Sequence, residues 1–241
     1  MLESVILLTG SGEQSILAAR LAAFRPEIGI IPAHSKADLL ALDAATLSGA
    51  RLLAFVTSTI VPASVLAALG HGAYNFHPGP PDYPGLSPTQ FALYDGARSF
   101  GATVHRMVAA VDAGPIVAVS EFAMPESPTL NAVETLAFQH LARLFWDLSP
   151  VLMADAPLSE TSIAWGQRKS TRRSTEDMCA IGADVGAAEL HRRVAAFGHS
   201  PLGIRPTVTL HGYRFRLEPD QMPADEPAAV RIESTAAPSA A

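Results

Sequence analysis

The sequence has very little cysteine, no long hydrophobic run and no excess of positive charge. Cys179 is the single cysteine among 241 residues, which excludes an internal disulfide and a cysteine-rich metal site and fits a reducing compartment. No apolar run approaches the roughly 20 residues of a membrane span. The net charge of −6 argues against general nucleic-acid affinity. The opening residues lack a basic segment and a cleavage site, so we expect no signal peptide and a cytoplasmic location.

Length and charge distribution suggest one large domain with an appendage. Hydrophobic residues make up 49% of the chain, which is enough for a sizeable core. Residues 1–160 carry 7 basic and 14 acidic side chains, whereas residues 161–217 carry 9 basic and 4 acidic ones. We expect a main domain at 1–155, a small C-terminal α+β subdomain at 156–218, and a disordered tail rich in Pro, Ala and Ser at 219–241.

Apolar runs alternate with helical patterns along the first part of the chain. Strands are predicted at 4–9, 27–32, 51–56, 73–77, 101–108 and 115–122. Helices are predicted at 36–47, 63–69, 89–95 and 130–148. The subdomain is predicted to hold a strand at 162–165, a helix at 187–197 and a hairpin at 207–217. The alternation predicts an α/β fold with a Rossmann-like, mostly parallel sheet.

A glycine turn, Gly10-Ser11-Gly12, lies between the first strand and a helical pattern. Such a turn places a helix N-terminus where an anion could bind. The third glycine of the dinucleotide fingerprint is missing, because Ser15 stands in its place. A tight structural turn and a substrate-binding loop are therefore both open interpretations.

Polar side chains gather at the end of the predicted strand 73–77. Because strand residues alternate between faces, Asn75 and His77 share one face, and the proline-rich loop that follows cannot extend the sheet. Parallel α/β folds present polar chemistry at the carboxyl ends of their strands. Asn75 offers an uncharged N–H donor, and His77 offers a group that titrates near neutrality. Each alone is also compatible with a purely structural role.

Several motifs occur together in this region. They are Asn75-x-His77-Pro78, Tyr83-Pro84-Gly85, Gly101-Ala102-Thr103-Val104-His105 and Asp112-Ala113-Gly114-Pro115-Ile116. In this order they resemble the core signature of the 10-formyltetrahydrofolate-dependent formyltransferases. That family includes glycinamide ribonucleotide transformylase, methionyl-tRNA formyltransferase and the sugar N-formyltransferases. The resemblance covers about residues 50–125 well and the first 50 residues loosely.

The resemblance implies a formyltransferase catalytic domain at 1–155 that uses 10-formyltetrahydrofolate as co-substrate and no metal. It implies that Asn75, His77 and Asp112 are catalytic. It assigns folate binding to Ile60, Val61, Val111, Ala113 and Gly114. It assigns acceptor binding to Gly10, Ser11, Gly12 and Gly79. Gly79 departs from the family, which often has serine there, and the loop after it is one residue shorter.

Formyl transfer is acyl transfer, which needs a donor for the developing oxyanion and a group that moves protons. Asn75 suits the first task. His77 suits the second as an imidazolium, whose pKa a nearby Asp112 would raise. We interpret His105 as structural, although the similar Thr-Val-His strand of the family lines the site. We interpret Trp165 as buried in the appendage, with stacking on a sugar or a nucleotide base as the alternative. The basic cluster at 168–173 is either a solvated face or a substrate contact.

The predicted function is therefore transfer of a formyl group to an amine of a small-molecule acceptor, with an amino sugar favoured. Methionyl-tRNA is disfavoured because the C-terminal part is short and the chain acidic. Hydrolysis of the formyl-folate and a non-catalytic folate-binding module are the alternatives. We expect neither a membrane nor a nucleic acid as partner, and a homodimer remains open.

Overall fold

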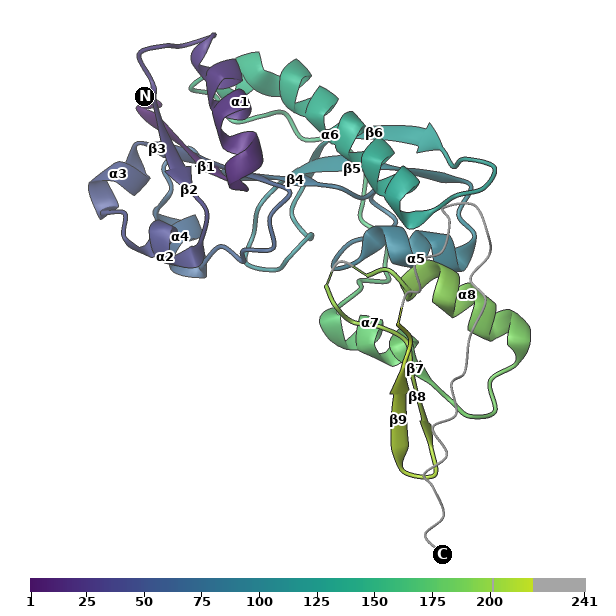
Figure 1. Ribbon diagram of the computed structural model, residues 1–241. Coiled ribbons are helices and arrows are strands. Elements are labelled where there is room, and N and C mark those ends of the chain that lie inside the picture. Colours follow the sequence, from purple (N-terminus) through teal and green to yellow (C-terminus); the bar gives the residue numbers. More distant parts are fainter. Residues whose placement is uncertain (201, 219–241) are drawn as a thin grey trace, which may run out of the picture. The chain divides into compact units, whose positions relative to one another are not determined.

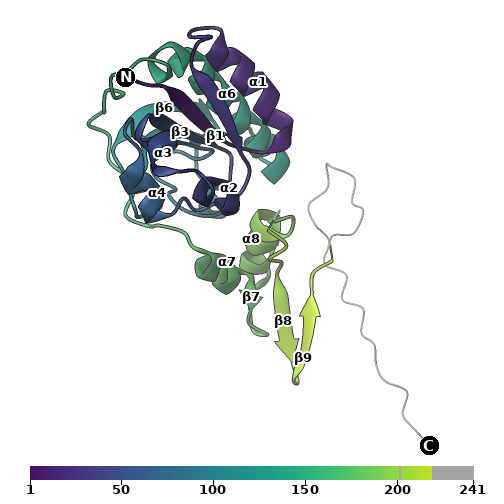
Figure 2. The ribbon, with the colours of Figure 1, turned by 90° about the vertical axis from the view of Figure 1, so that its left-hand side faces the viewer.

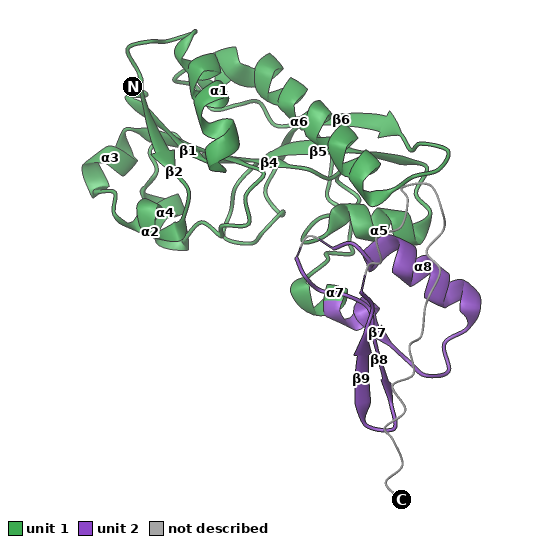
Figure 3. Ribbon diagram, viewed as in Figure 1, with its two compact units in different colours: residues 1–175 green, residues 176–241 purple. Residues whose placement is uncertain are grey.

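A computed structural model describes residues 1–200 and 202–218 of the chain (Figure 1). The chain divides into two compact units, residues 1–175 and 176–241 (Figure 3). This division falls later than the boundary predicted near residue 155, because the intervening stretch hydrogen-bonds to loops of the first unit through Thr161, Gly166 and Ser170. The assignment of separate functions to the two parts stays a prediction. The predicted disordered tail at 219–241 lies outside the described residues.

A six-stranded sheet forms the centre of the first unit. Its strands are β1 (Ser4–Leu8), β2 (Gly29–Ala33), β3 (Ala50–Phe55), β4 (Ala73–His77), β5 (Ser99–Arg106) and β6 (Ile116–Ala123). Their order is β2-β1-β3-β4-β5-β6; the first four are parallel, and β5 and β6 are antiparallel to their neighbours. The predicted mostly parallel α/β sheet is confirmed.

Helices cover both faces of this sheet (Figures 1 and 2). Helices α1 (Ser11–Ala22) and α6 (Leu130–Leu152) lie on one face, and α2 (Lys36–Leu40), α3 (Ala44–Ser48) and α4 (Ala63–Ala68) lie on the other. Side chains alternate between the two cores with the two-residue period of a strand: Val5 and Leu7 face α1 and α6, whereas Ile6 and Leu8 face the other helices. Helix α5 (Pro88–Asp95) packs against α6 through Ala92 and Ala137.

Several predicted elements differ from those in the structure. The helix predicted at 36–47 is two short helices, because Asp43 accepts a hydrogen bond from Thr46 N at 2.7 Å and caps α3. The strand predicted at 162–165 does not form: the backbone on either side of it bonds to separate carbonyls, those of Ile116 and Pro81. Helix α6 continues past residue 148 to Leu152 and contains Pro150.

The second unit carries the predicted helix and hairpin. Helix α8 (Ala187–Phe197) precedes strands β8 (Thr207–Leu210) and β9 (Tyr213–Arg216), which pair antiparallel. The short strand β7 (Ala180–Ile181) adds to β8 in parallel and was not predicted. Helix α7 (Arg172–Cys179), also not predicted, spans the division between the units.

Arg51 interrupts the otherwise apolar strand β3 and is fully buried. Its guanidinium donates to the carbonyls of Leu152, Ala154 and Ala156 at 2.6, 2.9 and 2.8 Å, and also to those of His71 and Val151. The last carbonyls of a helix have no partner within the helix, and a cation near them is favourable. Arg51 therefore ties the end of α6 to the sheet.

We predict that Arg51→Leu lowers the free energy of unfolding by at least about 3 kcal/mol, because each orphaned buried carbonyl costs about 1–3 kcal/mol. Urea denaturation measures this change. Arg143→Leu is the matched control, because Arg143 lies on the same helix α6 in an exposed ion pair with Asp147 and should matter little. Equal losses in both variants would contradict the role given to Arg51.

Candidate active site

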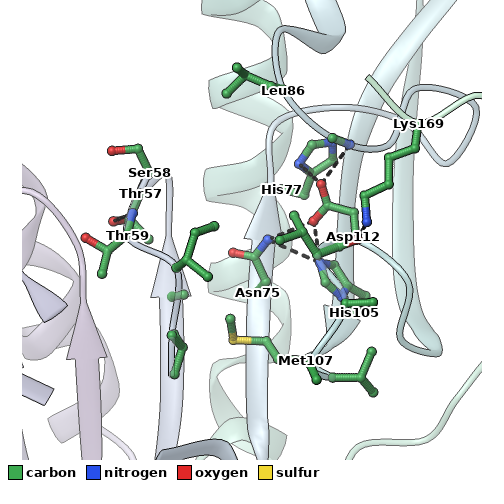
Figure 4. A pocket seen from close by; sticks show the side chains of 18 of the residues that line it. Thr57, Ser58, Thr59, Asn75, His77, Leu86, His105, Met107, Asp112 and Lys169 are labelled. Carbon is green, nitrogen blue, oxygen red and sulfur yellow. Dashed lines mark hydrogen bonds and ion pairs between the residues drawn. The ribbon is translucent and has the colours of Figure 1, made fainter. Parts of the chain in front are cut away.

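A cavity of about 430 Å³ lies at the carboxyl edge of the sheet in the first unit (Figure 4). The loop 57–61 after β3 forms one part of its wall, and Asn75 and His77 of β4 form another. His105 of β5 and the loop 107–112 continue the wall, and residues 169–172 complete it. The cavity thus lies where parallel α/β folds place their binding sites.

Asp112 is the centre of a buried polar cluster in this wall. Its carboxylate lies 3.5 Å from His77 Nδ1 and 3.2 Å from His105 Nε2, and it accepts hydrogen bonds from Asn75 Nδ2 at 3.5 Å and from Gly85 N at 2.8 Å. Figure 4 shows Asn75, His77 and His105 pointing toward it. The structure thus brings together the three predicted catalytic side chains.

Unusual backbone conformations place Asp112 at this point. Asp112 itself has a positive φ of 41°, which is uncommon for a residue with a side chain. Two residues later, a Cβ on Gly114 would lie 1.8 Å from Arg106 O. Gly85 has φ 100°, and a Cβ there would lie 2.0 Å from Ser170 O. Only glycine therefore fits these two positions, and both hold the backbone around the carboxylate.

Both ring nitrogens of His77 face oxygen atoms. Nδ1 faces Asp112, and Nε2 lies 3.3 Å from Tyr83 O. A neutral imidazole can donate to only one of these acceptors, whereas an imidazolium can donate to both. Burial nevertheless lowers the pKa of His77 below its ordinary value, although the charge of Asp112 acts in the opposite direction. The prediction that Asp112 would raise this pKa has the right sign for that pair, but burial outweighs it.

Asp112 is held as a carboxylate. Burial alone would raise its pKa, but the hydrogen bond with His105, the charges of His77 and His105, and the Gly85 N–H lower the pKa of Asp112 to about 2. A group with this pKa is ionised at neutral pH. The site therefore contains one buried negative charge between two imidazoles.

His105, interpreted from the sequence as structural, lies in the cluster instead. It is 3% exposed, and its Nε2 lies 3.1 Å from Asn75 Nδ2 as well as near Asp112. In the register of β4 and β5, Asn75 pairs directly with His105, and His77 pairs with Thr103. This pairing is the signal that would have found it, but it requires knowing that β5 runs antiparallel beside β4.

Of the residues predicted to bind folate, Ile60, Val61 and Val111 line the cavity. Ala113 and Gly114 do not. The carbonyl of Gly114 accepts instead from Trp165 Nε1 at 2.8 Å. Lys169 belongs to the basic cluster at 168–173, for which the sequence left a solvated face and a substrate contact open; its Nζ contacts Val111 O at the cavity wall. The binding roles of the predicted residues stay predictions.

The residues predicted to bind the acceptor lie outside the cavity lining. Gly10 is the N-cap of α1, and Ser11 and Gly12 form its first turn. The carbonyl of Gly79 accepts a hydrogen bond from Thr103 Oγ1 at 2.7 Å, and a Cβ on Gly79 would lie 2.6 Å from His77 Nε2. Because glycine has no Cβ, the imidazole of His77 fits beside Gly79, which is a structural reason for glycine at this position.

Within residues 1–200 and 202–218, no three His, Cys, Asp or Glu side chains are grouped so as to hold a metal ion. Over the same residues, none of the helices combines the length and the apolar character that crossing a membrane requires.

Comparison with known proteins identifies one family. Residues 50–140 match the formyl transferase family. The methionyl-tRNA formyltransferase of Bifidobacterium adolescentis is 32% identical over 162 residues, which cover 64% of this chain and 48% of that protein. The matches with the first curated relatives span between 24% and 48% of their length.

Solved structures of formyltransferases share the fold. A sugar N-formyltransferase from a Shewanella species superposes with a TM-score of 0.73 at 16% identity, covering 93% of this chain and all of that one. A formyltransferase from Anoxybacillus kamchatkensis, solved with UDP-4,6-dideoxy-4-formamido-L-AltNAc and tetrahydrofolate, superposes with a TM-score of 0.58 at 19% identity, covering 72% and 88%. The resemblance found in the sequence is confirmed, and residues 50–140, which supply the Asn75, His77, His105 and Asp112 cluster, match the formyl transferase family.

Proposed function

We propose that the protein transfers the formyl group of 10-formyltetrahydrofolate to an amine of a small-molecule acceptor. The observation that carries this proposal is the convergence of Asn75, His77 and Asp112 on one cavity, at distances of 3.5 Å from the carboxylate. The apolar residues Ile60 and Val61 in the cavity wall fit a flat ring system. The related fold solved with tetrahydrofolate supports the same co-substrate.

In this reaction the amine nitrogen bonds to the formyl carbon, the bond from that carbon to N10 breaks, and one proton passes from the amine to N10. Asn75 Nδ2 would donate to the formyl oxygen as it gains negative charge, which is the task of an oxyanion-hole donor. His77, neutral because burial lowers its pKa, would accept the amine proton and deliver it to N10. Asp112 would stabilise the imidazolium while it holds that proton.

Two positively charged side chains favour an anionic acceptor. Lys169 and Arg172 both line the cavity, on the side formed by residues 169–172. Charged donors of this kind suit phosphate groups. A nucleotide-linked amino sugar has both a phosphate and an amine, and the Anoxybacillus relative was solved with a sugar nucleotide. We therefore favour an acceptor of this class over a neutral amine.

The first prediction concerns the reaction itself. Purified protein incubated with 10-formyltetrahydrofolate should release tetrahydrofolate only when an acceptor amine is present. Mass spectrometry should find the amine heavier by about 28 mass units, the mass of the CO that formylation adds. His77→Ala should reduce turnover roughly 10²–10⁴-fold, the usual contribution of a general acid–base group. His191→Gln, an exposed histidine of α8, is the matched control. Release of formate without any amine would instead favour hydrolysis.

The second prediction concerns protonation. Asp112 is the charge that opposes the lowering of the His77 pKa. In Asp112→Asn, only the hydrogen bond to Tyr83 O still opposes burial and the charge of His105, so the pKa of His77 should fall further. Titration of the His77 Cε1–H resonance by NMR measures it. A midpoint that rises in this variant would contradict the assignment of charges.

The third prediction concerns the acceptor. Arg172→Ala should raise the acceptor KM while the Kd for the formyl-folate stays nearly unchanged, and the effect should shrink at high salt. Arg173→Ala is the control, because Arg173 is the next residue and exposed but does not line the cavity. Identical acceptor kinetics in both variants would remove the support for an anionic acceptor and leave formyl transfer untouched.

A further inference from the structure

Trp165 contacts both imidazoles of the cluster without lining the cavity. Its indole packs edge to face against His105, with ring centroids 5.0 Å apart, and against His77 at 6.0 Å. Both imidazoles line the cavity, whereas Trp165 does not. Any influence of Trp165 on a bound molecule would therefore pass through the two histidines.

The same indole also holds the turn that carries Asp112. Its Nε1–H donates to Gly114 O at 2.8 Å, two residues beyond Asp112. That turn needs external support, because Asp112 occupies the left-handed region at φ 41°. One side chain thus contacts both histidines and fixes the backbone next to the carboxylate between them.

Backbone hydrogen bonds on both sides hold Trp165 in place. On one side, Thr161 N donates to Ile116 O at 2.7 Å. On the other, Gly166 N donates to Pro81 O and Ser170 N to Pro84 O, each at 2.9 Å. Leu86 N returns a bond to Ser170 O at 3.1 Å. The segment 161–170 is therefore a strap, bonded along its length to the start of β6 and to the proline-rich loop.

We propose that Trp165 is a positioning residue, which the strap 161–170 presses against His77 and His105 so that both imidazoles and Asp112 keep one arrangement. The indole covers the edges of the rings and excludes water from them. The groups that face the two imidazoles are Asp112 from the turn, Asn75 from β4, and the carbonyls of Tyr83 in the proline-rich loop and of Arg106 in β5. Lys169 lines the same cavity.

Trp165 makes two contributions, the ring contacts with the histidines and the hydrogen bond to Gly114 O, and two variants distinguish them. Trp165→Ala removes both the ring contacts and the hydrogen bond to Gly114. Trp165→Phe keeps an aromatic ring against the histidines and removes only the N–H donor. Trp146→Phe is the matched control, because Trp146 is the other of the two tryptophans and packs, from α6, against Phe145 of the same helix and Arg20 of α1.

NMR of the histidine Cε1–H resonances tests the proposal without any assay of activity. In Trp165→Ala the ring-current shifts of His77 and His105 should disappear, and the titration midpoint of His77 should rise because burial, the main cause of its lowered pKa, is reduced. Trp165→Phe should retain most of both properties, and Trp146→Phe should match the parent. Unchanged histidine resonances and an unchanged midpoint in Trp165→Ala would overturn the proposal.

The kinetic test rests on the proposed function. In Trp165→Ala, kcat should fall by up to about 100-fold, as expected when catalytic groups are slightly misplaced, with little change in the KM of either substrate. A loss of stability alone, with kcat per folded molecule preserved, would reduce Trp165 to a structural residue. If the parent protein transfers no formyl group, the proposed function fails, and the NMR measurements alone decide the role of Trp165.

Should Trp165→Ala fail to fold, Trp165→Phe carries the test through the hydrogen bond. Loss of the N–H donor frees the turn at Gly114, so the Gly85 amide, which donates to Asp112 at 2.8 Å, should exchange faster with solvent than in the parent. Equal exchange rates in Trp165→Phe and the parent would overturn the positioning role.

Discussion

The site depends on one buried carboxylate. Asp112 is 6% exposed and lies against donors from β4, from β5 and from the proline-rich loop. A buried charge is costly unless it is paired and hydrogen-bonded, so moving any of these donors away from Asp112 carries that cost. The conformation of the turn 112–115 and that of the loop around Gly85 are thereby coupled, although they are distant in sequence. The arrangement of the cavity wall follows from this coupling.

Much of the fold and half of the site follow from local patterns. Apolar runs separated by helical patterns predicted the parallel strands, and the two-residue period correctly placed Asn75 and His77 on one face of β4. Asp112 was found through the resemblance, because an aspartate in a glycine turn has an equally good structural explanation. The helix predicted over 36–47 was wrong because hydrophobic spacing outweighed a capping signal, Asp43 with Thr46, that was present in the sequence.

The residues that sequence reasoning misplaced all depend on long-range packing. His105 joins the cluster only because β5 reverses direction beside β4, so that it pairs with Asn75. Trp165 reaches the cluster because residues 161–170 bond to loops that lie 45 or more positions earlier in the chain. No periodicity within a single segment carries this information. The same long-range packing buries His77, which is why the effect of Asp112 on its pKa was predicted with the right sign and yet does not prevail.

The residues of the site fall into two groups, one inside and one outside the segment that matches the formyl transferase family. The cluster around Asp112 lies wholly within residues 50–140, the segment that matches the formyl transferase family. The residues that complete the cavity, 169–172, and the strap that contacts the histidines lie beyond that segment. Chemistry common to a family requires a fixed cluster, whereas recognition of different acceptors requires a wall that can change. Under the proposed function, this division assigns the chemistry to the matching segment and the acceptor contact to the residues after it: the strap contacts the histidines through Trp165 and brings Lys169 to the cavity, and Arg172 follows the strap.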